Sequence, residues 1–438
     1  MEIDKTTLND LAIFTGEEDF SVFNKLNNAI TTNGKEQLKK NLATPLPTTE
    51  AIIDVQQTIR LILKKETEWP KEISHGTIMV VQRFYEYSFD PLPKIVSSLT
   101  ANSYKLLHGP DYSLIKYSII HCFDFIKGML AFTDKFLNEN TPGPLKKLLE
   151  TAAKTLATEQ LLIVQNYHKS SELSIPQQLQ LAQFLRYHFK QNMFTLIAIH
   201  AQLDAWYGMA MTVKKYQLVF PEFIEREQPL LEVKEMFHIL LENPTPYDLE
   251  MNPKCNFLFL TGANMAGKST FIKAVGTAVF LAHVGMGVPA KKMRLTLFDG
   301  MLSNINVIDN IAKGESYFYN EVQRIKATIN KINDGRKWLI LIDELFKGTN
   351  VQDAMKCSTA VIEGLLKIKN SLFILSTHLY EIGEALKVHP NISFNYFETS
   401  TENGKLSFNY QLRNGISNDR LGYLILEREG VVKMLENL

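Results

Sequence analysis

The 438-residue sequence has few cysteines and no excess of charge of either sign. Its three cysteines, Cys122, Cys255 and Cys357, lie far apart without Cys-x-x-Cys spacing. This excludes a zinc site built on cysteine pairs and is typical of thiols in a reducing compartment. The 47 basic and 47 acidic residues cancel, so the chain lacks the global basic signature of many nucleic-acid-binding proteins.

The sequence also lacks low-complexity segments, evident short repeats and a long uninterrupted apolar run. Its most apolar stretch, 274–290, contains His283, several glycines and Pro289, which favours a buried helix and its exit over a membrane span. The polar start at 1–5 argues against a signal peptide. We therefore expect a cytoplasmic protein without a membrane partner. Its length predicts more than one domain.

Residues 261–270, Thr-Gly-Ala-Asn-Met-Ala-Gly-Lys-Ser-Thr, match the Walker A template Gly-x4-Gly-Lys-[Ser/Thr]. An apolar stretch at 256–260 precedes them and helix-forming residues follow, so the turn joins a strand to a helix N-terminus, where unpaired N–H groups favour phosphate. A glycine-rich turn without a ligand is the alternative, which this context disfavours. We expect Lys268 to reach the β- and γ-phosphates and Ser269 to ligate Mg²⁺. The predicted ATP-binding residues are Gly262, Ala263, Asn264, Met265, Ala266, Gly267, Lys268, Ser269 and Thr270.

Two further apolar segments end in polar groups that suit ATP hydrolysis. Residues 338–344, Trp-Leu-Ile-Leu-Ile-Asp-Glu, have the Walker B pattern about 75 residues beyond Lys268. We expect Asp343 to hold Mg²⁺ through water, with Ser269 as the other protein ligand, and Glu344 to act as general base. Residues 373–378 end in His378. A lone histidine at a strand end is more often structural, but the order Walker A, Walker B, strand–His is that of ABC-class ATPases, in which this histidine contacts the γ-phosphate. The predicted catalytic residues are Glu344, His378 and Lys268.

The segment between these motifs resembles the signature of MutS-type mismatch-repair ATPases, Gly-x-Ser-Thr-Phe-Met-x-Glu. Here it reads Gly314-Glu-Ser316-Tyr-Phe318-Tyr-Asn-Glu321. Further matches to that family are Asn264-Met265 in the P-loop, Val288-Pro289-Ala290 after its helix, and Gly348-Thr349 after Walker B. The chain is identified on these motifs as a member of the MutS family, in a short form that lacks the N-terminal mismatch-reading domain.

The first half resembles the MutS helical core more weakly. Thr31-Thr-Asn-Gly34 has its Thr-x-x-Gly pattern, and the stretch from Leu203-Asp204 resembles the helix that returns to the ATPase. The resemblance implies an all-α core and lever at 1–220, followed by an α/β P-loop ATPase domain of ABC type at 221–438. Alternating apolar segments and helices after residue 257 independently predict a mostly parallel sheet.

The resemblance also implies a homodimer with composite ATP sites. Ser316 of one subunit would donate hydrogen bonds to the γ-phosphate held by Lys268 of the other, so that ATP binding closes the dimer and moves the lever. His238 and Tyr247 are candidates to pack on the adenine, although Asn243-Pro-Thr-Pro departs from the family pattern there. Tyr317 and Phe346 replace residues usual in the family, which leaves the hydrolysis rate open.

Two classes of function remain open from the sequence. The first is a DNA-acting ATPase of mismatch repair or recombination that uses ATP and Mg²⁺ and binds mismatched or branched duplexes. The alternative is an ABC-class ATPase that acts on a protein partner without direct DNA contact. The neutral overall charge weighs against the first class, and the motif set supports it. Stimulation of ATP hydrolysis by DNA distinguishes the two.

Overall fold

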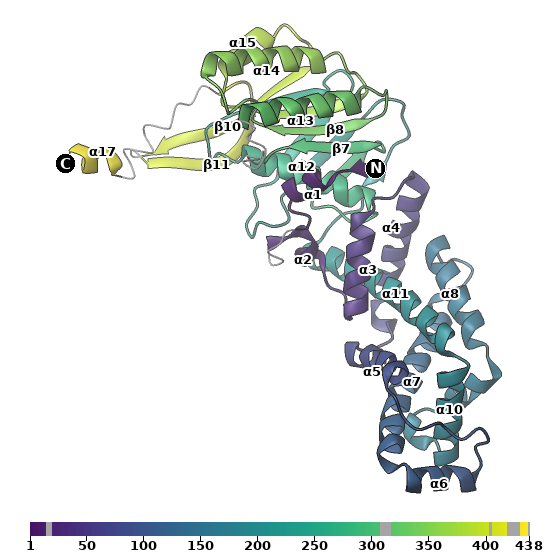
Figure 1. Ribbon diagram of the computed structural model, residues 1–438. Helices are drawn as coiled ribbons and strands as arrows, with labels where there is room; N and C mark the ends of the chain where they lie inside the picture. Colours follow the sequence, from purple (N-terminus) through teal and green to yellow (C-terminus); the bar gives the residue numbers. More distant parts are fainter. Residues whose placement is uncertain (15–19, 307–316, 403–404, 418–429, 437–438) are drawn as a thin grey trace. The chain divides into compact units, whose positions relative to one another are not determined.

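The computed structural model describes residues 1–14, 20–306, 317–402, 405–417 and 430–436 (Figure 1). The chain forms two compact units. An α/β unit comprises Met1–Lys25, Pro45–Ile52 and Tyr216–Leu438, and a helical unit comprises Leu26–Thr44 and Ile53–Lys215. This is the expected combination of a helical region with a mixed, mostly parallel α/β unit.

A seven-stranded sheet forms the centre of the α/β unit, in the order β1-β7-β8-β9-β5-β10-β11. All neighbours are parallel except β10 and β11, which form an antiparallel pair. The strands are β1 (Glu2–Ile3), β5 (Phe257–Thr261), β7 (Gly300–Asn304), β8 (Trp338–Asp343), β9 (Ser371–Ser376), β10 (Ile392–Glu402) and β11 (Lys405–Asn414). A second, four-stranded sheet has the order β2-β6-β3-β4 and consists of β2 (Glu222–Phe223), β3 (Leu231–Met236), β4 (Tyr247–Met251) and β6 (Lys292–Leu295).

Every residue of β5, β7, β8 and β9 is buried, because helices cover both faces of the large sheet. Trp338, Ile340 and Ile342 of β8 pack in one cluster with α13 and α14. The intervening Leu341 points the other way, where a Cβ at Gly276 of α12 would lie 2.7 Å from its Cδ1. Figure 1 shows α13 and α14 on one side of the strands and α1 and α12 on the other. The helices of this unit are α1 (Lys5–Asp10), α12 (Lys268–His283), α13 (Tyr317–Ile332), α14 (Val351–Leu365), α15 (Glu381–Leu386) and α17 (Val431–Glu436).

The extreme N-terminal segment belongs to the α/β unit, whereas the sequence analysis placed all of 1–220 in the helical domain. β1 pairs in parallel with β7, and the Asp10 carboxylate accepts hydrogen bonds from the Ser303 hydroxyl (2.6 Å) and the Ile305 amide (3.0 Å). A two-residue strand and a six-residue helix are too short to show a periodic pattern, so the sequence did not indicate this docking.

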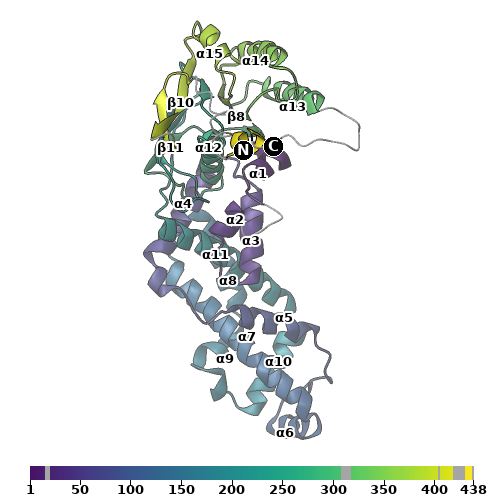
Figure 2. The ribbon, with the colours of Figure 1, turned by 90° about the vertical axis from the view of Figure 1, so that its left-hand side faces the viewer.

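The helical unit is built around two long helices, and α6 forms one end of the unit in both views (Figures 1 and 2). Helix α8 buries one face, formed by Leu145, Leu149, Ala152 and Leu156. The helices are α3 (Thr32–Ala43), α4 (Thr49–Lys64), α5 (His75–Glu86), α6 (Ser98–Leu107), α7 (Gly109–Phe136), α8 (Gly143–Leu156), α9 (Leu162–Asn166), α10 (Ile175–Tyr187) and α11 (Lys190–Tyr216). The chain passes from one unit to the other within α2 (Val22–Leu26) and near the start of α4. No described helix is long and apolar enough to cross a membrane.

The two segments that resemble the MutS core meet inside the helical unit. The buried Asp204 carboxylate accepts hydrogen bonds from the Ile30 amide (2.9 Å), the Thr31 amide (2.8 Å) and the Thr31 hydroxyl (2.6 Å). Burial raises the pKa of Asp204, and the Thr31 hydroxyl opposes the rise. A Cβ at Gly34 would lie 2.8 Å from the Asp204 Cβ, so the glycine permits this approach. The Thr-x-x-Gly pattern thus caps α3 against α11.

A candidate nucleotide site at the ends of the central strands

The glycine-rich turn connects β5 to α12 as the sequence predicts. Gly262 (φ 138°) and Gly267 (φ 108°, the residue before α12) have left-handed backbone conformations that side chains rarely adopt. A Cβ at Gly267 would also lie 3.3 Å from the Tyr410 ring. Met265, at φ 68°, is 74% exposed at the tip of the turn. The turn therefore presents backbone amide groups at the start of a helix, where an anion is favoured.

Lys268 points back into this turn. Its Nζ donates hydrogen bonds to the carbonyl oxygens of Gly262 (2.8 Å) and Ala263 (2.9 Å), and only 5% of the residue is exposed. Burial lowers the pKa of Lys268, and the nearby carboxylates of Glu344 and Asp343 oppose this change. The ammonium group is thus held by two neutral carbonyl groups, which charged phosphate oxygens can replace.

Asp343 lies at the end of β8 between two serine hydroxyl groups. Ser269 donates to its Oδ2 (2.5 Å) from the first turn of α12, and Ser376 donates to its Oδ1 from the end of β9. Mg²⁺ prefers oxygen ligands, including hydroxyl, carboxylate and water oxygens. The Ser269 hydroxyl and the Asp343 carboxylate are oxygen groups of this kind within hydrogen-bond distance of each other, so they suit a magnesium ion that Ser269 ligates and Asp343 holds through water.

Glu344 adopts a left-handed backbone conformation (φ 60°), and its amide donates to the Ser376 carbonyl (3.0 Å). One carboxylate oxygen lies 3.8 Å from His378 Nδ1, and the other lies 3.0 Å from Lys347 Nζ. His378 and then Lys347 lower the pKa of Glu344 to about 2, against the effect of burial. Glu344 is therefore ionised at neutral pH and has the charge that a general base requires. The predicted histidine lies directly beside the predicted base.

A pocket of about 560 Å³ opens over these groups. The lining includes residues that the sequence analysis predicted for the site, namely Asn264, Met265, Gly267, Lys268, Ser269, Thr270, Glu344 and Tyr247. It also includes residues that the sequence analysis did not assign to the site, namely Leu241, Asn243, Thr245 and Tyr410. The pocket brings the Walker A and Walker B residues together with one wall that the sequence analysis did not assign.

The two candidates for the adenine contact have different surroundings. Tyr247 lines the pocket and packs edge-on against Phe271 and Phe397, at 5.4 and 5.7 Å between ring centroids, and burial raises its pKa to about 12. His238 is not among the lining residues. Its Nδ1 accepts from the Leu240 amide (3.3 Å), and burial, with a contribution from Lys273, lowers its pKa to about 4.

Tyr410 was missed by the sequence analysis. Strands β10 and β11 form an antiparallel pair, and Tyr410 (φ 53°, 44% exposed) reaches the P-loop from β11. Strand alternation indicates which residues share a face, but it does not indicate that this face packs on the glycine-rich turn. The predicted residue Ser316 lies outside the described residues.

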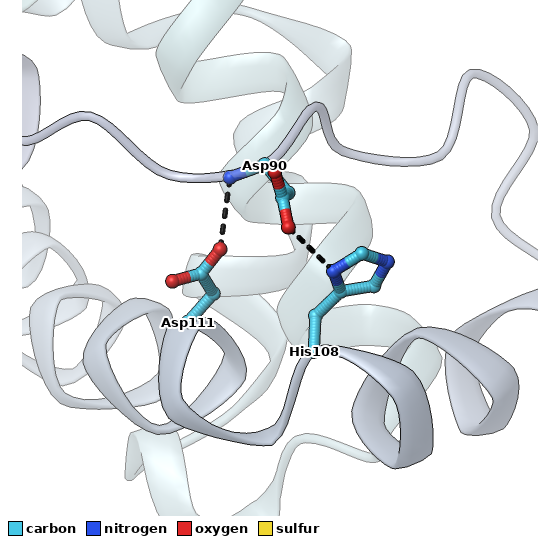
Figure 3. A group of neighbouring side chains, drawn as sticks. All are labelled: Asp90, His108 and Asp111. Carbon is cyan, nitrogen blue, oxygen red and sulfur yellow. Dashed lines mark hydrogen bonds and ion pairs between the residues drawn. The ribbon is translucent and has the colours of Figure 1, made fainter.

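A second group of metal-binding residue types lies in the helical unit (Figure 3). Asp90, His108 and Asp111 have ligand atoms within 4.8 Å of one another. His108 Nδ1 and the Asp90 carboxylate form a 2.7 Å hydrogen bond, and the Asp90 amide donates to Asp111 (2.8 Å). These hydrogen bonds connect the loop before α6 to the start of α7. They explain why the three side chains lie close together without a metal ion.

Comparison with known proteins identifies relatives of this chain. Residues 258–435 match the family model MutS domain V. The DNA mismatch repair protein MutS of Thermus aquaticus is 32% identical over 238 residues, 54% of this chain and 28% of that protein. MutS of Geobacillus kaustophilus is 29% identical over 285 residues, 63% of this chain and 31% of the relative. The DNA mismatch repair protein spellchecker 1 of Drosophila melanogaster is 28% identical over 230 residues, 51% of this chain and 25% of the relative. The chain thus spans less than a third of the length of these relatives.

Proposed function

The C-terminal part of this chain belongs to the MutS domain V family, and from this premise we propose that the protein is a Mg²⁺-dependent ATPase. MutS domain V is an ATPase domain. The observation that carries the proposal is the convergence of Lys268, Ser269 and Glu344 at one pocket, with Asp343 hydrogen-bonded to Ser269 beside it. These residues come from the P-loop and from the end of β8. They provide a cation for phosphate, oxygen ligands for the metal and an ionised carboxylate for water.

In the proposed complex the phosphates of ATP occupy the turn formed by Gly262 to Thr270. Lys268 exchanges its two carbonyl partners for β- and γ-phosphate oxygens, and the amides of the turn donate to the same groups. Ser269 and Asp343 hold Mg²⁺, which neutralises charge on the phosphates when it is bound. Ser376 keeps the Asp343 carboxylate oriented through the second oxygen.

Hydrolysis needs a water molecule positioned between the γ-phosphate and a base. Glu344 is ionised and lines the pocket, so it accepts the proton of that water. His378, whose side chain is 53% exposed, is free to turn from Glu344 towards the γ-phosphate. We assign the orienting contact with the γ-phosphate to His378, and the contact from the second subunit to Ser316.

The composite site makes closure of a homodimer part of the reaction. ATP binds the P-loop of one subunit, and the signature segment of the other subunit completes the site. Because the nucleotide then has a higher affinity for the closed dimer than for the open one, binding shifts the population towards closure. The helical unit transmits this change to the partner that it binds.

We propose DNA as that partner, in repair or recombination, because the relatives are named as DNA mismatch repair proteins. One observation favours the second candidate, a protein partner. Helix α6 and the turn before it expose four large apolar side chains at the end of the helical unit, which suit a protein surface better than a phosphate backbone. They are Ile95 (79% exposed), Leu99 (82%), Leu106 (85%) and Leu107 (75%).

The test is the ATPase activity of the purified protein with homoduplex, mismatched and four-way-junction DNA, each at low and moderate salt. We expect one DNA form to raise the rate, and more strongly at low salt, because phosphate contacts release counterions. Equal activity with all three DNA forms and without DNA would favour the protein-directed alternative. Absence of hydrolysis in every condition would contradict the ATPase itself.

A further inference from the structure

The turn that carries Glu344 is held from a second side by helix α13. Glu321, on the second turn of this helix, is only 4% exposed. One of its carboxyl oxygens accepts the Lys347 amide and the other accepts the Gly348 amide, both at 3.2 Å. A buried carboxyl group that accepts two consecutive backbone amides fixes the position of that backbone.

Packing around these hydrogen bonds leaves little room for movement. The rings of Phe318 and Phe346 lie 5.7 Å apart. A Cβ at Gly348 would lie 2.7 Å from the Phe318 amide nitrogen and 2.8 Å from the Tyr317 ring. The glycine therefore permits close contact between the turn and the first residues of α13.

The backbone of the same turn is strained. Glu344 and Phe346 both have φ near 60°, which is unfavourable for a residue with a side chain. Such a conformation persists only where its surroundings enforce it. On the side of the sheet, the Glu344 amide donates a hydrogen bond to the Ser376 carbonyl. On the side of α13, the Glu321 carboxyl group holds the turn through its two hydrogen bonds with backbone amides.

We infer that Glu321 is a positioning residue for hydrolysis, which holds Glu344 and Lys347 in place through the 344–348 turn. The inference rests on the proposed ATPase function. Lys347 Nζ lies 3.0 Å from the Glu344 carboxylate, so the backbone that Glu321 fixes determines both the base and its neutralising cation. Helix α13 begins within the signature-like segment, of which Glu321 is the last residue, so a displacement of α13 reaches the base of the same subunit through these two hydrogen bonds.

Glu321→Ala and Glu321→Gln test this role in the full-length protein. We expect Glu321→Ala to lower kcat about 10- to 100-fold while the Kd for ATP changes less than about twofold, because misplacement of a catalytic group costs rate and the phosphate contacts are unchanged. Glu321→Gln should fall between it and the wild type, since its amide has one acceptor oxygen for the two backbone donors. The matched control is Thr328→Ala on the same helix, which removes a buried hydrogen bond with Asn304 (3.2 Å) and leaves the turn untouched.

The measurements are single-turnover hydrolysis and binding of a fluorescent ATP analogue. Wild-type kcat in either well-folded Glu321 variant would overturn the positioning role, as would an equal loss of kcat in Thr328→Ala. If Glu321→Ala does not fold, Glu321→Gln decides alone. A wild-type protein that does not hydrolyse ATP would instead contradict the proposed function, so the two failures are distinguishable.

Discussion

At the residue scale, the described site depends on charged groups held by a few short contacts. Lys268 is buried against two backbone carbonyls, Asp343 lies between two serine hydroxyls, and Glu344 is kept ionised by His378 and Lys347. In each case the partners are ones that phosphate, magnesium or water can replace. The roles assigned to these residues can therefore be tested one substitution at a time.

Lys268→Ala should weaken ATP binding by about 100-fold or more, because it removes a buried cation paired with the phosphates. Lys273→Ala, on the next turn of α12 and outside the pocket lining, is the control and should bind normally. Titration with a fluorescent ATP analogue measures both. Unchanged affinity in Lys268→Ala would overturn the assignment of the phosphate site.

Tyr410→Ala should weaken ATP binding about tenfold, since an aromatic ring in the pocket wall offers a stacking surface worth about 1–3 kcal/mol to a base. Tyr410→Phe keeps the ring and should bind as the wild type does. The comparison of ATP with inorganic triphosphate isolates the base, because triphosphate binding should not respond to either substitution. A Tyr410→Ala variant with wild-type ATP affinity would remove Tyr410 from the site.

At the element scale, the sequence predicted those parts of the site that follow a continuous apolar strand. β5, β8 and β9 are buried along their whole length, and their polar groups begin where each strand ends. Parallel strands bring these ends to one edge of the sheet, so order along the chain was enough to place Ser269, Asp343 and His378 together. The same reasoning could not find Tyr410, or a role for Glu321 beyond its place in the signature-like segment, because their roles depend on how a hairpin and a helix pack against the P-loop and the Walker B turn.

The N-terminal segment is the clearest case of an element that the sequence did not place. Asp10 and Thr7 of α1 form hydrogen bonds with the end of β7, and Arg324 of α13 lies 3.7 Å from the Asp10 carboxylate. Arg324 also donates to the Asn306 carbonyl (2.6 Å). A charge pattern in six residues carries no information about a contact almost 300 positions away.

Asp10→Ala should lower the free energy of unfolding of the α/β unit by about 2–4 kcal/mol, because several buried donors lose their acceptor. Asp4→Ala removes the partly buried helix cap of α1, where Asp4 accepts from the Thr7 amide (2.7 Å), and should cost only about 1 kcal/mol. Urea unfolding followed by circular dichroism measures both. Equal losses in the two variants would show that Asp10 does not anchor the end of β7.

At the scale of the whole molecule, the chain joins an α/β unit whose residues 258–435 match MutS domain V to a helical unit that contains an exposed apolar helix. The ATPase motifs explain how the protein would bind and hydrolyse nucleotide. The partner of the helical unit is a separate question. The neutral net charge and the apolar α6 surface favour a protein partner, whereas the names of the relatives favour DNA.

The most direct test of the central claim is the solution mass of Glu344→Gln, measured by light scattering with Mg²⁺ and with or without ATP. The substitution removes the base and keeps the metal and phosphate contacts, so ATP binds without being consumed. We predict a dimer of about twice the mass of the 50.0 kDa chain that retains ATP and persists after excess nucleotide is removed, whereas wild type releases it as ADP. A Glu344→Gln protein that hydrolyses ATP at the wild-type rate, or binds ATP without any change in mass, would contradict the account.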